Sequence, residues 1–311
     1  MTQGFGAQAT AQITAHRASR WALFKRSIRW YPFLVINLVV FVIFNLVPWI
    51  SMITTSFTDW DMLTPSEWVG LGNFQELFTD ELLRISIANT FYYALMQVPL
   101  ISIVSLVVAI FVNRRLFGMK FFRGLYFLPN VTSIAVLAMI FWRFLSPRPD
   151  GPLNYLLGLV GIPPLKFLVS TSLALPSLVG LAVWGGFGYQ MVIWLAGLQG
   201  IPSELYDAAL VDGASGFKLH RYVTIPLLRP TAAFILVTAT LGSLQVFASI
   251  YMMTGGGPVN ATLTVAYHIY RTAFIFGKLG YASALSILLF AIILAIAYLQ
   301  GRFLRFGEDV Y

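Results

Sequence analysis

Residues 85–112 read ISIANTFYYALMQVPLISIVSLVVAIFV, a long run of uncharged and mostly apolar residues. A helix needs about 20 such residues to cross the roughly 30 Å of hydrocarbon in a bilayer. The run exceeds that length, and no charged face is available to meet water. It therefore predicts a transmembrane helix, and the rest of the chain can be interpreted from it.

Five more runs have the same character. They lie at Phe33–Ile53, Gly124–Phe144, Leu173–Leu198, Thr231–Met253 and Ala282–Phe303. The whole chain of 311 residues is 58% hydrophobic and only 10% charged, whereas soluble domains carry about 25% charged residues. The predicted fold class is all-α, an integral membrane bundle of six transmembrane helices.

The basic residues predict the orientation of this bundle. The formal net charge of +8 could indicate a nucleic-acid partner, but the charges lie in short connections between apolar runs, so no nucleic acid is expected. Segments 1–30, 113–123, 199–230 and the end from Arg302 hold 14 of the 20 Lys and Arg residues. Positive charge marks the cytoplasmic side, so both termini are predicted to be cytoplasmic.

The predicted organisation follows from these spans. Residues 1–30 form a basic cytoplasmic tail, residues 31–305 the six-span domain, and residues 306–311 a short cytoplasmic tail. The chain has no cysteine, which excludes disulfides and thiolate metal sites. No nucleophile, metal cluster or paired carboxylates stand out, so the chain is not expected to be an enzyme.

The connection at 200–230, GIPSELYDAALVDGASGFKLHRYVTIPLLRP, is the most informative segment. It predicts two short helices joined by a bend. Ser203 can cap the first helix, and Gly213 can end it in the left-handed conformation. Ser215 can cap the second, which Pro226 should stop. The segment should form a compact helical projection into the cytoplasm.

This segment resembles the EAA loop of binding-protein-dependent ABC importer permeases. Asp207-Ala208-Ala209, Gly213 and Pro226 have the spacing of that loop, with Asp207 in place of the usual Glu and Ile225 in place of the usual Leu. The resemblance implies that the segment couples the permease to an ATPase. The implied coupling residues are Glu204, Asp207, Ala208, Ala209, Asp212, Gly213, Ala214 and Pro226.

Three other motifs resemble the carbohydrate branch of this family, specifically the F subunit of the maltose type. They are Val69-Gly70-Leu71-Gly72-Asn73-Phe74, Asp150-Gly151-Pro152-Leu153-Asn154 and Thr254-Gly255-Gly256-Gly257-Pro258. The resemblance implies a multi-pass protein of a prokaryotic inner (plasma) membrane, in contact with lipid, that imports a sugar, expected to be an oligosaccharide, by alternating access. It also implies three kinds of partner: a second permease in a heterodimer, two copies of an ATPase and an extracytoplasmic sugar-binding protein.

No cofactor is expected in this chain, because it has no Walker A sequence; ATP and Mg should be bound by the partner ATPase. One alternative is an ABC permease for a glycerol phosphate or polyol derivative. A secondary carrier is less favoured, because no Asp, Glu, Lys or His lies in the middle of a span, where ion or proton sites occur.

Polar and aromatic residues within the spans are candidates for the substrate pathway, because polar groups are costly in hydrocarbon and sugars pair with aromatic faces and amides. The alternative for each is helix packing. The candidates are Gln190, Ser243, Gln245, Ser249, Trp184, Trp194 and Tyr251, with Asn89 and Gln97 weighed as weaker ones.

Overall fold

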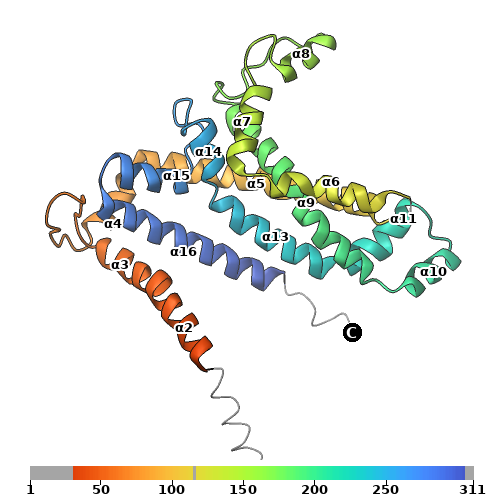
Figure 1. Ribbon diagram of the computed structural model, residues 1–311, viewed down its shortest axis with the longest axis horizontal. Coiled ribbons are helices and arrows are strands. Elements are labelled where there is room, and N and C mark those ends of the chain that lie inside the picture. Colours follow the sequence, from red (N-terminus) through yellow and green to blue (C-terminus); the bar gives the residue numbers. More distant parts are fainter. Residues whose placement is uncertain (1–30, 115–116, 305–311) are drawn as a thin grey trace, which may run out of the picture. The chain divides into compact units, whose positions relative to one another are not determined.

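The computed structural model describes residues 31–114 and 117–304, and it is helical apart from an isolated β-bridge between Thr58 and Trp68 within those residues (Figure 1). The predicted tails at 1–30 and 306–311 lie outside the described residues. Two compact units are present: one ends at Thr55 and the other begins at Ser56. Each is described by itself.

The first unit contains one apolar helix built from α2 (Tyr31–Phe41), η1 (Val42–Leu46) and α3 (Val47–Thr55). The π-helical turn η1 precedes Pro48, and the Val47 N–H bonds to the Val42 carbonyl. This wider turn accommodates a proline that has no N–H of its own. None of the residues of α2, η1 or α3 is buried, as expected of a helix whose sides face lipid.

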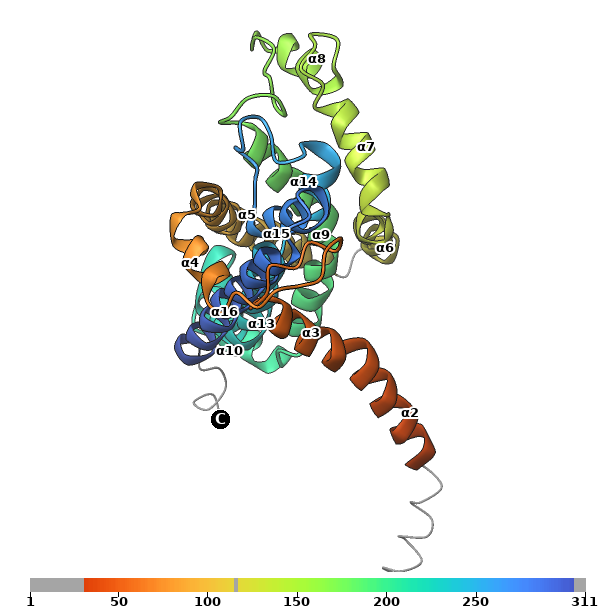
Figure 2. The ribbon, with the colours of Figure 1, turned by 90° about the vertical axis from the view of Figure 1, so that its left-hand side faces the viewer.

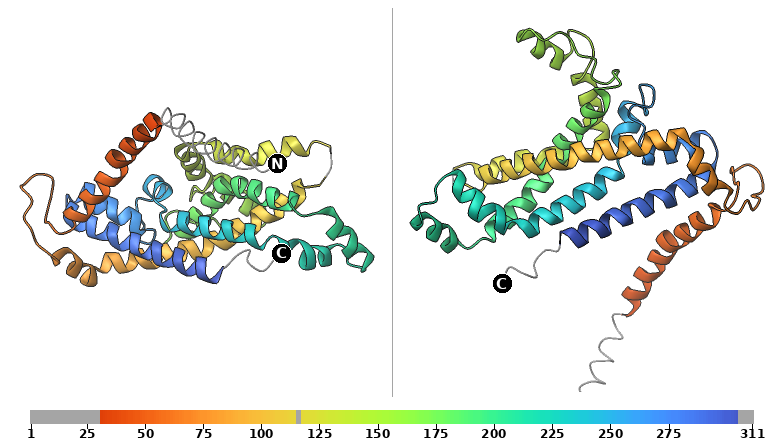
Figure 3. Two further views of the ribbon diagram at one scale, coloured as in Figure 1. Left: turned by 90° about the horizontal axis from the view of Figure 1, so that it is seen from below. Right: turned by 180° about the vertical axis from the view of Figure 1, so that it is seen from behind.

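The second unit is organised around α5 (Glu81–Val112), which packs against α9 (Ala174–Gln199) and α13 (Arg229–Leu244). Helix α16 (Leu279–Phe303) lies along α13, and α6 (Met119–Val131) lies along α9 (Figures 1 and 3). A side chain at Gly188 of α9 would collide with the Tyr126 carbonyl of α6. Small residues let helices approach closely when no hydrophobic effect drives them together.

Within the described residues, four helices can cross a membrane by length and composition, or up to six if each bent pair counts as one span. Helices α6 and α7 (Ile134–Phe144) meet at 94°, because Thr132 and Ser133 are extended and the Ser133 side chain caps α7. The continuous run expected at Gly124–Phe144 is therefore corrected to a broken one. Figure 2 shows α7 leading from this bend to α8 (Pro152–Leu159).

The run expected at Thr231–Met253 is also broken. Helix α13 ends at Leu244, and α14 (Ala248–Met253) begins after an irregular segment at residues 245–247. The Thr264 hydroxyl donates to the Val246 carbonyl at 3.0 Å. Irregular backbone is tolerated at membrane depth only where such partners exist.

The remaining short elements connect the long helices. Helix α4 precedes α5; α10 to α12 connect α9 to α13; and α15 with η3 precede α16. Their bounds are α4 (Gly72–Thr79), α10 (Ser203–Val211), α11 (Phe217–Leu219), η2 (His220–Thr224), α12 (Ile225–Leu227), α15 (Val265–Tyr270) and η3 (Arg271–Ile275).

Asparagine side chains, two of them buried, fix three connections between helices. Asn73 donates to the Ser56 and Thr58 carbonyls, both at 2.8 Å. The Asn154 amide donates to the Leu165 carbonyl at 3.0 Å and accepts from the Leu165 N–H at 2.9 Å. Asn89 of α5 donates to the Asn260 carbonyl at 2.9 Å, so the structure assigns this residue to holding a turn rather than to a substrate.

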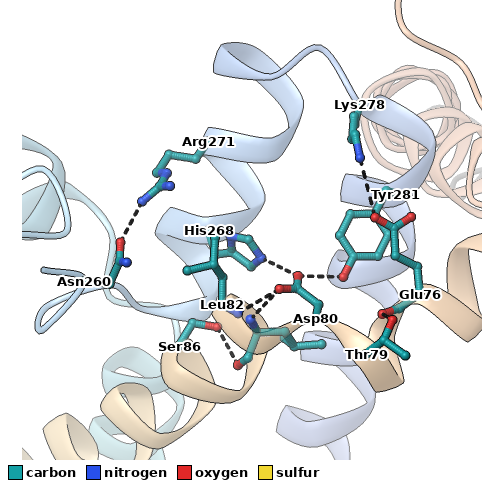
Figure 4. Close-up of polar contacts among 11 residues, drawn as sticks. Glu76, Thr79, Asp80, Leu82, Ser86, Asn260, His268, Arg271, Lys278 and Tyr281 are labelled. Atoms are coloured by element: carbon teal, nitrogen blue, oxygen red, sulfur yellow. Dashed lines mark hydrogen bonds and ion pairs between the residues drawn. The ribbon is translucent and has the colours of Figure 1, made fainter.

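Asp80 joins the start of α5 to α15 and α16 (Figure 4). One carboxylate oxygen accepts from the Leu82 and Leu83 N–H groups at 2.8 and 3.1 Å, which caps α5. The other oxygen lies 3.0 Å from His268 Nε2 and accepts from the Tyr281 hydroxyl at 2.7 Å. Burial alone raises the pKa of Asp80, but the hydrogen bonds from His268, Tyr281 and Leu83 together hold that pKa below its ordinary value.

Asp80→Asn should therefore lower the melting temperature of the purified protein, because the amide cannot accept all four hydrogen bonds. Leaving a buried partner unsatisfied costs about 1–3 kcal/mol. The folded-state pKa of Asp80 is depressed, so its contribution is present above the ordinary value of about 3.9 and is lost as pH falls through the lower folded value. Thermal unfolding measured from pH 7 downward should show the two proteins converging below that point.

Asp150→Asn is the control, because Asp150 pairs with Arg148 at an exposed site, where ion pairs contribute little. Equal melting temperatures for the parental protein and Asp80→Asn at pH 7 would contradict the assignment.

Candidate functional site

The segment between α9 and α13 begins with α10. Its N-terminal cap is Pro202, with no side-chain cap, so the expectation that Ser203 caps this helix is wrong; Ser203 is its first residue. Gly213 has φ +81°, and the Ala214 N–H returns to the Ala209 carbonyl at 2.9 Å. The prediction that a left-handed Gly213 ends the helix is confirmed.

The second half differs more from expectation. Ser215 does not cap α11; the residue before that helix is Gly216, with φ +54° and ψ −123°, a conformation open only to glycine. Nor does Pro226 stop the helix. The π-helical turn η2 precedes it, and Pro226 lies at the start of α12, which ends at Leu227. The π-helical turn continues directly into α12, since the Ile225 N–H bonds to the His220 carbonyl, and this wider turn accommodates a proline that has no N–H.

Two contacts tie the halves of this segment together. The Thr224 hydroxyl lies 3.2 Å from the Tyr206 hydroxyl and 3.2 Å from His220 Nδ1. Thr224 is buried, so these contacts are shielded from water. Helix α10 is thereby linked to η2.

The surface of the segment carries exposed apolar, acidic and basic side chains. Val211 is 88% exposed and Phe217 73% exposed. Of the predicted coupling residues, Glu204, Asp207, Ala208, Asp212 and Gly213 are exposed, and Ala209, Ala214 and Pro226 are partly buried. The structure thus gathers them on one projecting segment.

A second feature lies between α5, α9 and α13. It is a cavity of about 280 Å³ whose lining carries no acidic or basic side chain. Five aromatic or amide side chains line it, together with small residues that leave it open. The lining is Tyr93, Gln97, Ile101, Asn130, Ala182, Gly186, Tyr189, Gln190, Thr238, Ala239, Gly242, Ser243 and Val246.

Two buried acceptors in this lining have no partner. Gln97 Oε1 and Gln190 Oε1 make no hydrogen bond within the described part of the chain. Ser243 donates its proton to the Thr240 carbonyl at 2.8 Å, so its oxygen is also left as an acceptor. An unsatisfied buried polar group is costly, and all three oxygens belong to side chains that line the cavity.

The predicted pathway residues divide between this cavity and other places. Gln190 and Ser243 line it, as does the weaker candidate Gln97. Trp194 does not: its indole N–H donates to Ser105 Oγ at 3.1 Å, and its ring belongs to a hydrophobic core. Trp194 therefore serves helix packing.

The other candidates lie outside the cavity lining. Gln245 is exposed at the break after α13 and donates to the Leu241 carbonyl at 3.1 Å. Ser249 is buried in α14. Trp184 and Tyr251 are about half exposed, next to Phe187 and Phe247 respectively. A substrate role for these four remains a prediction.

Sequence reasoning missed Tyr93, Tyr189, Thr238 and Asn130 as cavity residues. Tyr93 and Gln97 lie one helical turn apart, as do Gly186 and Gln190, so they share a face of their helices. This spacing is the sequence signal that could have identified them as cavity residues. It does not indicate which face of a helix meets a cavity.

Known proteins resemble this chain over most of its length. Residues 83–305 match the family described as "Binding-protein-dependent transport system inner membrane component". A probable ABC transporter permease of Bacillus subtilis, YesP, is 35% identical over 273 residues, covering 86% of this chain and 88% of that protein. The trehalose/maltose transport system permease MalF of Thermococcus litoralis is 33% identical over 279 residues, covering 86% and 92%.

A diacetylchitobiose uptake permease of Streptomyces coelicolor, NgcF, is 30% identical over 303 residues, covering 92% of this chain and 85% of that one. Among solved structures, a bacterial ABC transporter involved in the import of the acidic polysaccharide alginate matches with a TM-score of 0.79 and 25% identity, covering 94% of this chain and 100% of the matched chain. The chain therefore belongs to the binding-protein-dependent transport system inner membrane components, the family of ABC transporter permeases.

Proposed function

We propose that this chain is one of two pore-forming permeases of an ATP-driven importer that takes up neutral oligosaccharides. The cavity between α5, α9 and α13 carries the proposal. Its uncharged lining and its unpartnered Gln97 and Gln190 oxygens fit a ligand that is neutral and rich in hydroxyl groups. The names of the relatives, which refer to trehalose, maltose and diacetylchitobiose, support a sugar.

Neutrality distinguishes the proposed substrate from that of the matched solved transporter, which imports an acidic polysaccharide. A uronate or a phosphate would need a cation or several N–H donors inside the bundle, since an unpaired charge there is costly. The lining described above contains no Lys, Arg or His. A glycerol phosphate is disfavoured for the same reason.

The energy for transport comes from partner subunits in this proposal. The glycine run Gly255–Gly257 lacks the Gly-Lys-Ser/Thr ending of a phosphate-binding loop, so ATP and Mg are assigned to a pair of ATPases. A second permease, different in sequence, completes the pathway. An extracytoplasmic binding protein delivers the sugar, in keeping with the family to which the chain belongs.

The connectivity suggests how ATP hydrolysis reaches the cavity. The α10–α12 segment follows α9 directly and leads into α13, and both helices line the cavity. Because α10 is tied to η2 through Thr224, the segment can move as one body against the ATPase. Such a motion shifts two of the three main walls of the cavity relative to α5, which is the change that alternating access needs.

The first test is reconstitution. The purified chain alone should hydrolyse no ATP. The complete complex in lipid vesicles should show ATPase activity that the binding protein and a neutral oligosaccharide stimulate together, and it should accumulate the labelled sugar. If a uronate oligomer stimulates the ATPase activity and no neutral oligosaccharide does, the proposed substrate class is contradicted.

Gln190→Leu should raise the KM of uptake, because the cavity loses an acceptor for a sugar hydroxyl. The loss of such a bond is worth about 1–3 kcal/mol, or roughly 5- to 150-fold. Gln300→Leu is the matched control: Gln300 also has a buried, unpartnered Oε1, but it does not line the cavity. Gln245→Leu tests the remaining sequence prediction in the same assay. Identical uptake kinetics for Gln190→Leu and the parental complex would exclude Gln190 from the pathway.

The glycines of the α10–α12 segment allow a test of coupling. Gly213→Val should weaken copurification of the ATPase or uncouple hydrolysis from uptake, because a β-branched residue is strained at φ +81°. Gly213→Asn should be tolerated better, since Asn adopts the left-handed region. Gly216→Asn should be as harmful as Gly213→Val, because ψ is −123° there. A Cβ atom at either glycine would have open space around it, so the backbone alone decides. Normal coupling in Gly213→Val and Gly216→Asn would remove the segment from the coupling path.

A further inference from the structure

A row of aromatic side chains begins one residue after the cavity lining along the chain. Phe247 directly follows the cavity residue Val246, and its ring stacks on Tyr251 with 5.5 Å between centroids and 15° between planes. The Tyr270 ring lies 5.3 Å from Phe247 and 5.2 Å from Tyr251. Phe274 continues the row, 5.3 Å beyond Tyr270. We call Phe247, Tyr251, Tyr270 and Phe274 the aromatic row.

The aromatic row leaves the cavity on the side away from the α10–α12 segment. Helix α13 begins beside that segment at Arg229 and ends at Leu244, and the row follows this far end. Helix α15, which carries Tyr270, is tied to the opposite part of α5, because the Val265 N–H donates to the Thr90 hydroxyl at 3.0 Å. In the predicted orientation this is the extracytoplasmic side, where the binding protein delivers its sugar.

The rings are supported from behind and open in front. Buried Tyr267 lies 6.1 Å from both Phe247 and Tyr270. Tyr251 is 47% exposed and Phe274 is 67% exposed. The row thus leaves the side chains of Tyr251 and Phe274 partly open.

The size of the cavity indicates what the row is for. Pockets that enclose a small molecule measure about 300–1,000 Å³, and this one, at about 280 Å³, falls at the lower limit. On this chain the pocket is small and open on one side, and the rings of an oligosaccharide that it does not hold would lie outside it. The aromatic row begins one residue after the cavity lining along the chain, and the apolar C–H face of a pyranose fits an aromatic face.

Building on the proposed function, we propose that the aromatic row is a stacking subsite for the sugar rings that extend beyond the cavity, and that it sets the preference of the importer for longer neutral oligosaccharides. Tyr251 and Phe274 are the residues whose exposed rings make this contact. Phe247 and Tyr270 hold them in line.

The test compares chain lengths in the complete reconstituted complex. The probes are three series of neutral oligosaccharides, built from glucose, galactose or N-acetylglucosamine, each with members of two to four rings. The variants are compared on the series that the parental complex takes up. Tyr251→Ala and Phe274→Ala should raise the KM for the tetrasaccharide about three- to tenfold, the range of one aromatic contact, and that for the disaccharide less than twofold. Tyr251→Phe, which keeps the ring, should retain the parental length dependence.

Phe78→Ala is the control, since Phe78 is 77% exposed and lies in α4, outside the row. An equal change in KM at every chain length would overturn the subsite. So would loss of the second permease on purification of Tyr251→Ala or Phe274→Ala, which would make the row a subunit contact. A parental complex that takes up none of the three series would instead overturn the proposed function, and the subsite with it.

Discussion

A side-chain amide buried within a helix bundle in hydrocarbon has no water to bind, so each of its polar atoms must find a partner in the protein or in a ligand. The bundle obeys this constraint closely. On α5, Thr90 and Ser102 donate to carbonyls one turn earlier, and Ser105 accepts from Trp194. Gln97 and Gln190 depart from this pattern at the cavity lined by α5, α9 and α13. Within the described residues, His268 Nδ1 and Gln300 Oε1 also have no partner, but neither residue lines the cavity. The proposed function depends on the pair at the cavity.

The motifs that relate the chain to sugar permeases play a different part. Asn73 and Asn154 fix connections between helices. In the glycine-rich turn, the Thr262 hydroxyl contacts Thr254 and donates to the Gly257 carbonyl, both at 2.7 Å. A side chain at Gly256 would meet the Tyr267 ring at 3.0 Å, so this glycine lets the turn lie against the rings behind the aromatic row. These motifs fix the turns and connections between helices, while few of the residues proposed to meet the sugar belong to them.

The approximate positions of the apolar helices could be predicted from the sequence, because the length of an apolar run is set by the bilayer. The left-handed Gly213 was predictable as well, since a glycine after a short amphipathic helix commonly ends it. The breaks at Thr132 and Gln245 could not be predicted, because an apolar run has the same composition whether its helix is continuous or bent. They depend on tertiary partners such as Thr264, which lies far along the chain.

The cavity was only partly predictable for a related reason. A polar residue in a span indicates a cavity or a partner helix without distinguishing them. Gln190 and Ser243 were expected on the pathway and line the cavity, while Trp194, selected by the same reasoning, serves packing through Ser105. Buried Tyr93 had no signal of its own, because tyrosines near span ends are usual interfacial residues. Gly216 was overlooked because the Ser215 before it offered a simpler cap.

The central claim is that the cavity between α5, α9 and α13 lies on the translocation pathway. The chain contains no cysteine, so Ser243→Cys provides a single reporter of nearly the same size. The most direct measurement is its modification by a small membrane-impermeant thiol reagent in the assembled transporter, followed on this chain by mass spectrometry. We expect modification from one side of the membrane without nucleotide and from the other when ATP is trapped, with protection by the transported sugar in the sugar-loaded state. A thiol that reacts from neither side, or whose reaction is indifferent to both nucleotide and sugar, would contradict the account.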